Sequence, residues 1–269
     1  MFLRKTIAFI KKDFLIQASY RLQFVLTWLG IVVQVWAFYF ISKLFGKTDT
    51  LHLKEYGGEY FSFVLIGLAF SGYFLTALRS LSVTIREEQM MGTLEAIVLT
   101  PTKISTLIIS LPCWGFIFTL INIFICLFLG ICFFGAKLSS IDIFAVSIIL
   151  ILTVISLGSI GILSAAFIVV FKRGDPIAWA IGVFSAFFGG AYFPIAILPQ
   201  KLKLISYCLP ITYSLRSLRH ALLQGYFFKA LLFDIVILLL FCIILGPLSV
   251  AVFKKAIKKA RVAGSLSHY

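Results

Sequence analysis

The run IFAVSIILILTVISLGSIGILSAAFIVVF, residues 143–171, contains 29 consecutive residues without a charged side chain. About 20 apolar residues in a helix cross the hydrocarbon core of a bilayer, so this run suffices for one span and must tilt or project from the membrane. It lacks the alternation of polar and apolar residues that the strands of a transmembrane β-barrel require. The run therefore predicts a membrane-spanning α-helix.

Five more uncharged runs occupy residues 24–42, 60–78, 104–136, 176–200 and 235–253. Of the 269 residues, 61% are hydrophobic and 13% are charged, whereas about a quarter of the residues in soluble domains are charged. The first run lacks a small-x-small cleavage site, so we expect it to be retained as a span. We predict an all-α integral membrane protein, a single transmembrane domain over residues 1–269. Its six spans are predicted at about 24–45, 60–79, 104–134, 143–171, 176–198 and 231–253.

The net charge of +14 is distributed mainly at the ends of the apolar runs, where Lys and Arg anchor helices and set their orientation. We therefore expect no nucleic-acid partner. If both termini are cytoplasmic, the inner segments hold fifteen Lys and Arg residues and the outer segments nine, five of them within residues 201–229. The positive-inside rule thus favours a multi-pass protein of the inner or plasma membrane with both termini in the cytoplasm.

Catalytic and metal-binding patterns are lacking in the sequence. His52, His220 and His268 lie in predicted loops or in the tail, and no His-Glu-x-x-His spacing occurs. The five cysteines have no paired spacing and are expected to act as small apolar residues. We expect no catalytic residue and no metal site on this chain.

Residues 1–23 place Leu3, Ile7, Ile10 and Phe14 at helical spacing, with basic residues on the other faces. This pattern is typical of an amphipathic helix that lies at the membrane interface near anionic lipid headgroups. The alternative is a basic flank that only fixes the topology.

Two amides stand out inside the predicted spans, Gln34 in the first and Asn122 in the third. A lone amide in a span commonly forms a hydrogen bond to a neighbouring helix, and the alternative is a role in a transport pathway. Pro112 is expected to kink the third span.

Residues 84–101 include REEQMMGTLEAIVLTP, residues 86–101, which holds three of the ten acidic residues. Met90 or Met91, Leu94, Ile97 and Val98 recur at helical spacing, with Glu88 and Glu95 on another face. Because the inner leaflet is negatively charged, an acidic surface helix is better suited to docking a protein than a lipid. We predict a cytoplasmic amphipathic helix that bends at Gly92; the alternative is a solvated acidic face.

Residues 189–229 are too apolar for a free loop, yet prolines at 194, 199 and 210 interrupt them. Irregular backbone is tolerated at membrane depth only where protein or water surrounds it, so residues 199–228 are predicted to form a re-entrant pair of short helices. Arg216 and Arg219 could attract an anionic substrate or lipid phosphate, and the alternative is interfacial packing. Asp234 could pair with one of these arginines.

Two motifs carry a resemblance to a known family. EEQMMGTLEAIVLTP resembles the Gly-Thr-Leu-Glu…Thr-Pro segment between the second and third spans of type-2 ATP-binding-cassette transporter permeases. GGAYFPIAILP, residues 189–199, with the segments that follow up to Gly225, is similar to the motif after the fifth span of the same family.

The resemblance implies roles for both segments. The first is a coupling helix that docks into a separate ATPase, and its candidate residues are Glu87, Glu88, Gly92, Thr93, Leu94, Glu95, Thr100 and Pro101. The second is an extracellular gate or re-entrant element, with candidates Gly189, Gly190, Phe193, Pro194, Pro199, Pro210, Tyr213, Arg216 and Arg219.

The resemblance also implies partners. They are an ABC ATP-binding subunit that binds ATP and Mg, a second identical or related permease, and membrane lipid. No cofactor is expected on this chain, because no Gly-x-x-x-x-Gly-Lys-Ser/Thr motif occurs in it. The implied function is export of a hydrophobic or amphipathic compound, a lipid or a lipid-linked polysaccharide. The alternative is a passive channel or a structural membrane protein without an ATPase.

Overall fold

A computed structural model describes residues 2–45, 53, 56–57, 59–93, 96–97, 104–139, 141–171 and 175–262. The described residues form helices and no strand. The helices are α1 (Phe2–Ser19), α2 (Arg21–Phe45), α3 (Tyr60–Met90), α5 (Ile104–Ser110), α6 (Cys113–Cys132), α7 (Ile143–Phe171), α8 (Pro176–Phe188), α9 (Gln200–Tyr207), α10 (Pro210–Leu223) and α11 (Leu232–Val262). Two short 3₁₀ helices, η2 (Ile195–Ile197) and η3 (Phe228–Leu231), precede α9 and α11.

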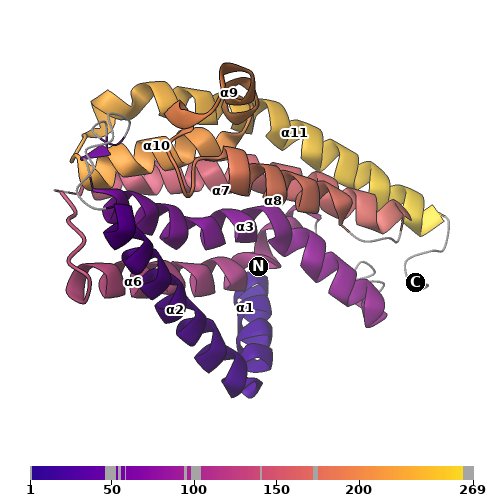
Figure 1. Ribbon diagram of the computed structural model, residues 1–269. Coiled ribbons are helices and arrows are strands. Elements are labelled where there is room, and N and C mark those ends of the chain that lie inside the picture. Colours follow the sequence, from indigo (N-terminus) through magenta and orange to yellow (C-terminus); the bar gives the residue numbers. More distant parts are fainter. Residues whose placement is uncertain are drawn as a thin grey trace.

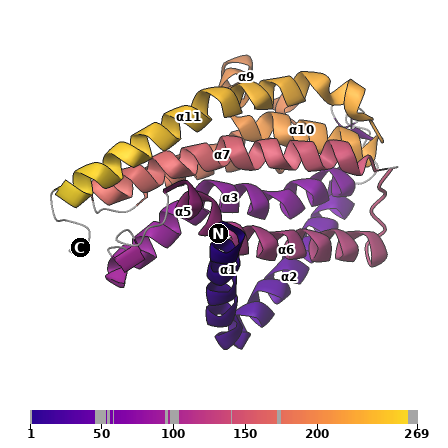
Figure 2. The same ribbon diagram turned by 180° about the vertical axis from the view of Figure 1, so that it is seen from behind.

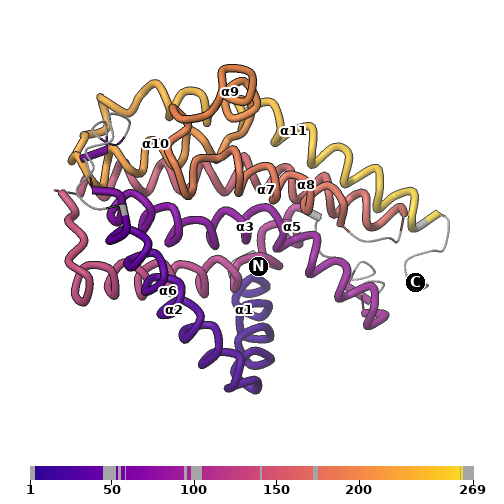
Figure 3. The backbone as a smooth tube through the Cα atoms, in the orientation of Figure 1, coloured from indigo at the N-terminus to yellow at the C-terminus, as the bar shows by residue number. Residues whose placement is uncertain are grey.

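The long helices form a bundle with α3 at its centre. Helix α3 packs between α6 and α7, while α10 and α11 pack against α7 (Figures 1 and 2). Among the candidate spans of the described residues, α3 is the most buried and α2 the least. Helix α1 lies across the direction of the bundle and contacts α5 and α6 (Figure 3). This arrangement fits the predicted interfacial helix, since a helix across the bundle direction runs along a membrane surface.

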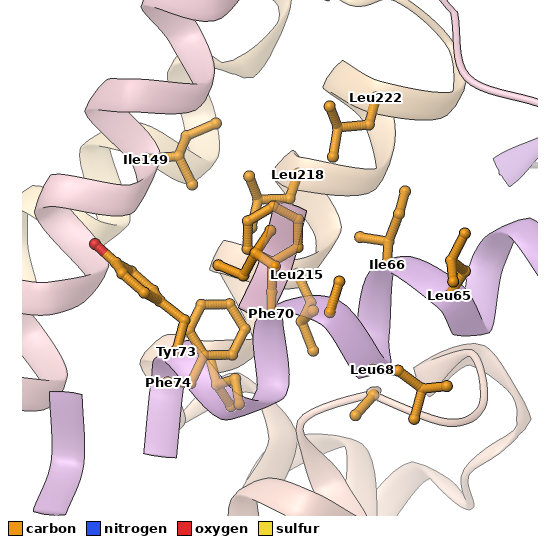
Figure 4. Close-up of a cluster of buried hydrophobic side chains, with 14 of the residues drawn as sticks. Leu65, Ile66, Leu68, Phe70, Tyr73, Phe74, Ile149, Leu215, Leu218 and Leu222 are labelled. Carbon is orange, nitrogen blue, oxygen red and sulfur yellow. The ribbon is translucent and has the colours of Figure 1, made fainter. Parts of the chain in front are cut away.

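The main core lies where α3, α7 and α10 meet. Ile66 and Phe70 of α3, Ile149 of α7 and Leu215 and Leu218 of α10 belong to one cluster of buried side chains, in which the two leucines lie between Ile66 and Ile149 (Figure 4). Close helix contact depends partly on small residues: a Cβ on Gly161 of α7 would lie 2.5 Å from the carbonyl oxygen of Leu78. A second core joins the other ends of α3, α7 and α11 to α5, around Ile85, Val169 and Phe253.

Six predicted spans correspond to five helical segments in the described residues that are long and apolar enough to cross a membrane, together with one shorter apolar helix, α8. The prediction of an all-α membrane protein is confirmed, and the count of six is roughly consistent with the structure. The third span is broken at Leu111 and Pro112 into α5 and α6, as Pro112 predicted.

The three largest differences from the predicted bounds are at the ends of spans. Helix α3 continues to Met90 and α11 to Val262, because no helix-breaking residue follows their apolar parts. Helix α8 has 13 residues and spans only about 20 Å at about 1.5 Å per residue, so it is shorter than the predicted fifth span. It ends at Phe188 because Gly189 and Gly190 follow, and Gly190 has a φ of 78°.

Candidate functional site

A cavity of about 390 Å³ lies between α2, α3, α6 and α8. Its volume falls within the range of about 300–1,000 Å³ that is typical of small-molecule sites. Both amides singled out in the sequence, Gln34 of α2 and Asn122 of α6, line this cavity. Their functional role stays a prediction, but the fold brings them to one site.

Two polar atoms of the cavity wall are buried without a hydrogen-bond partner in the described part of the chain: Asn122 Oδ1 and Ser185 Oγ. By contrast, the Thr119 hydroxyl, also in the wall, donates to the carbonyl oxygen of Gly115 at 2.6 Å and contacts the Thr76 hydroxyl at 3.0 Å. Because an unpaired buried polar group costs about 1–3 kcal/mol, Asn122 and Ser185 are suited to a bound molecule that supplies hydrogen bonds.

The rest of the wall is mainly apolar. It comes from α3, from residues 191–192 and from single residues of α7 and α10, and it includes Leu68, Phe74, Leu75, Leu78, Leu157, Ala191, Tyr192 and Ile211. No charged side chain occurs among the described residues that line the cavity. Such a site accepts an apolar molecule with a few hydrogen-bonding groups.

The acidic segment begins on α3 and not on a separate helix. Residues 84–90 form the last turns of α3, and Gly92 follows them with a φ of 70°. Glu87 is exposed, as are the side chains of Met90 (64%) and Met91 (72%). The predicted site residues Leu94, Glu95, Thr100 and Pro101 lie outside the described residues.

Glu88 is buried, unlike its neighbour Glu87. Its Oε1 atom is 2.5 Å from Nζ of Lys12 in α1, and its carboxylate also accepts a hydrogen bond from the Thr93 hydroxyl. Burial alone would lower the pKa of Lys12, but the hydrogen bond and the charge of Glu88 outweigh it and raise the pKa above its ordinary value. The ammonium therefore stays charged at neutral pH and ties α1 to the end of α3.

Further contacts fasten α1 to the bundle. The Thr6 hydroxyl lies 2.8 Å from that of Ser110 in α5, and the indole N–H of Trp114 in α6 donates to Gln17. Burial raises the pKa of Asp13, and the charge of Glu88 adds to this effect. Ile7 and Phe14, two of the predicted apolar residues, are exposed, although the Phe14 ring also contacts Trp114 of α6 with ring centroids 5.2 Å apart.

Arg219 in α10 is 3% exposed and joins three segments of the chain. Its guanidinium donates to the carbonyl oxygens of Gly190 at 2.7 Å, Ala191 at 2.9 Å and Phe63 at 3.2 Å. It also lies 3.5 Å from the centre of the Phe63 ring. These contacts make Arg219 a structural cross-link and give no support to an anion-binding role for it.

Arg216 pairs with Asp234 at the start of α11, as the sequence suggested for one of the two arginines. Its Nε is 3.2 Å from each carboxylate oxygen of Asp234, and its Nη2 forms a further hydrogen bond. The prolines act as predicted: Pro194 and Pro199 precede η2 and α9, and α10 begins at Pro210. Tyr213 donates to the carbonyl oxygen of Tyr207 at 2.9 Å, and Phe193 is partly buried.

Several residues of the site were not predicted from the sequence. Ser185 is an ordinary serine in an apolar run, and Lys12 is one of several basic residues near the amino terminus. Asp175 precedes Pro176 at the start of an apolar run, and its carboxylate accepts hydrogen bonds from Ser82 and Ser164 and caps α8 through the N–H of Ala178. Most of these contacts join residues that are far apart in the sequence, so no local sequence pattern predicts them.

The fold and the cavity define a class: a multi-pass helical membrane protein with an internal, largely apolar site. A family model described as ABC-2 type transporter matches residues 5–223, and the chain belongs to this family. Such domains are transmembrane components of transporters and are not themselves catalytic, and membership implies an ABC ATP-binding partner. A search of curated proteins gives no match to the sequence.

Proposed function

We propose that this chain forms the substrate pathway of an exporter that a separate ATP-binding subunit drives. The observation that carries the proposal is the cavity of about 390 Å³, in which the Asn122 and Ser185 side chains each have a buried polar atom without a hydrogen-bond partner among the described residues. The apolar wall favours a hydrophobic or amphipathic cargo, and lipids or lipid-linked polysaccharides belong to this class.

Helix α3 is the proposed connection between ATP hydrolysis and the cavity. The same 31-residue helix supplies Leu68, Phe74 and Leu78 to the cavity wall and ends at Met90, beside exposed Glu87. A continuous helix can transmit a displacement from one end to the other as a rigid element. We infer that Glu87 and the two methionines contact the ATPase, whereas Glu88 positions this end of α3 against α1.

A second permease, identical or related, is proposed to complete the pathway. Helix α2 contributes Thr27 and Gln34 to the cavity wall but is the least buried span, so much of its surface is available to a partner helix. In the proposed arrangement both termini are cytoplasmic, and two ATPase subunits bind at the α3 ends of the two permeases.

The first test concerns docking. We expect Glu87→Lys to reduce permease-stimulated ATP hydrolysis by about tenfold or more, because a charge reversal at a contact with a complementary surface weakens binding. The measurement is the ATPase activity of a candidate ABC ATP-binding subunit, reconstituted with this chain in vesicles. Glu59→Lys, the same reversal at an exposed residue before the other end of α3, is the control; it breaks only an exposed ion pair with Lys137 and should have little effect.

A wild-type chain that neither binds nor stimulates any ABC ATPase would contradict the proposal. Solute flux through it that persists without ATP would favour the passive channel instead.

The second test concerns the cavity. We expect Ser185→Phe to reduce ATP-dependent movement of a fluorescent phospholipid analogue or of Hoechst 33342 by at least about tenfold, the scale of one steric misfit in an apolar pocket. ATP hydrolysis should persist, since the ATPase contact is unchanged. Val183→Phe, on the same helix but outside the cavity wall, is the control. Equal transport by both variants would place the pathway elsewhere.

A further inference from the structure

A second, wider hollow lies at the other end of the bundle, where the last turns of α3 pass the end of α7 and the start of α8. It has a volume of about 990 Å³ and is separate from the cavity of about 390 Å³, because no described residue lines both. Its wall includes two arginines, Arg79 and Arg86, and the exposed ring of Trp179. We call this hollow the arginine groove.

The cations of the arginine groove share one face of α3. Arg79 and Arg86 are seven residues apart, which places them on the same side of the helix about 10 Å from each other. Neither forms an ion pair within the described part of the chain. Of the two acidic residues in the wall, Asp175 is already bonded to Ser82, Ser164 and the N–H of Ala178.

Glu87 is the other acid in the wall, and it is exposed at the end nearest the proposed ATPase contact. Asp175 and Glu87 together balance the two guanidinium groups in formal charge, but neither carboxylate pairs with Arg79 or Arg86 within the described residues, so both guanidinium groups keep donors for an anionic ligand.

Apolar side chains line the rest of the arginine groove. Trp179 is 61% exposed and Val83 43%, and Phe167 stacks on Phe171 with ring centroids 4.5 Å apart. Tryptophan is typical of the headgroup level of a membrane, where its ring contacts acyl chains and its N–H meets polar groups. A ligand that matches this wall therefore combines a negative headgroup with a hydrocarbon chain.

We propose that the arginine groove binds an anionic phospholipid from the adjacent leaflet, with its phosphate between Arg79 and Arg86 and an acyl chain along Trp179 and Phe167. The charges favour this occupant over a second copy of the chain, because each copy carries a net charge of +14 and would bring further positive charge. A free phosphate would leave the apolar wall exposed to water. Binding at this site would make the position of α3 depend on the anionic-lipid content of the leaflet.

The test uses the complete transporter, permease with ATPase, in lipid nanodiscs that contain brominated phosphatidylglycerol or brominated phosphatidylcholine. The signal is the quenching of Trp179 fluorescence by the brominated lipid, obtained as the difference between the wild type and Trp179→Phe. We expect a preference on the order of tenfold for the anionic lipid. Arg79→Gln with Arg86→Gln should abolish the preference, and Arg79→Lys with Arg86→Lys should retain most of it. Soluble glycerol phosphate, which lacks acyl chains, should leave the quenching unchanged.

Lys254→Gln with Lys258→Gln is the matched control, because it removes two exposed cations from the last part of α11 and changes the net charge equally. It should leave the preference intact. Equal quenching by both lipids in the wild type would overturn the proposal. If the control variant lost the preference for the anionic lipid as fully as the arginine variant, diffuse surface charge would explain the preference and the proposal would also fail. Protection of Trp179 from both lipids in the assembled transporter would also overturn it, because another subunit would then fill the groove.

Discussion

Glu88→Lys is expected to abolish permease-stimulated ATP hydrolysis and transport, with a larger loss than Glu87→Lys causes. The Glu88 side chain is nearly buried and contacts Lys12 at 2.5 Å, so a lysine at position 88 would place two cations together in a poorly solvated site. Breaking a buried pair by changing one partner costs about 3–5 kcal/mol. The contact is only partly buried, because the side chain of Lys12 is 42% exposed, so the lower end of this range applies.

The charge swap Lys12→Glu with Glu88→Lys separates the two roles that Glu88 could have. If Glu88 acts by holding α1 to α3, the double variant restores the pair, and we expect it to recover most of the stimulated ATPase activity. If the Glu88 carboxylate instead contacts the ATPase directly, the swap leaves that contact reversed and activity stays low. Lys12→Glu combined with Glu87→Lys is the control, and it should show no recovery because Glu87 faces solvent.

This distinction between two adjacent glutamates marks a limit of prediction from sequence. The pattern around residues 86–101 singles out the end of α3, since acidic residues are rare in so apolar a chain. Which glutamate faces outward depends on α1, a helix whose Lys12 lies 76 residues earlier in the sequence. No local periodicity encodes that contact, so Glu87 and Glu88 appeared equivalent.

Helix bounds could be predicted where the length of an apolar run and the position of helix-breaking residues agreed. The run 143–171 became α7 with the same bounds, and Pro112, Pro194, Pro199 and Pro210 each lie at a break or at a helix start. The predicted fifth span corresponds to the shorter helix α8, because the pair of glycines at 189–190 ends the helix although the absence of charge continues to residue 200. A glycine with a φ of 78° ends a helix regardless of hydropathy.

Arg219→Met is expected to lower the free energy of unfolding by about 3–5 kcal/mol, the scale for disrupting a buried, hydrogen-bonded charge. Three carbonyl oxygens, those of Phe63, Gly190 and Ala191, would each lose a donor. Thermal unfolding in detergent, followed by a thiol-reactive dye that labels the buried cysteines Cys126 and Cys242 as they become accessible, measures the change. Lys201→Met, which removes an exposed cation from α9, is the control and should be close to neutral.

Arg219→Lys should not rescue the loss, because a single ammonium cannot reproduce the planar fork that reaches three carbonyl groups. Gly67→Ala tests the same junction from α3: a Cβ at position 67 would lie 2.0 Å from the carbonyl oxygen of Ala191 and 2.9 Å from Nη2 of Arg219. Full stability in either variant would contradict the cross-link.

Since Ala191 and Tyr192 line the cavity, any Arg219 variant that still folds should bind cargo more weakly, with a raised KM for transport. If Arg219 instead bound an anion, its replacement would leave the unfolding temperature unchanged and would weaken only the transport of anionic cargo.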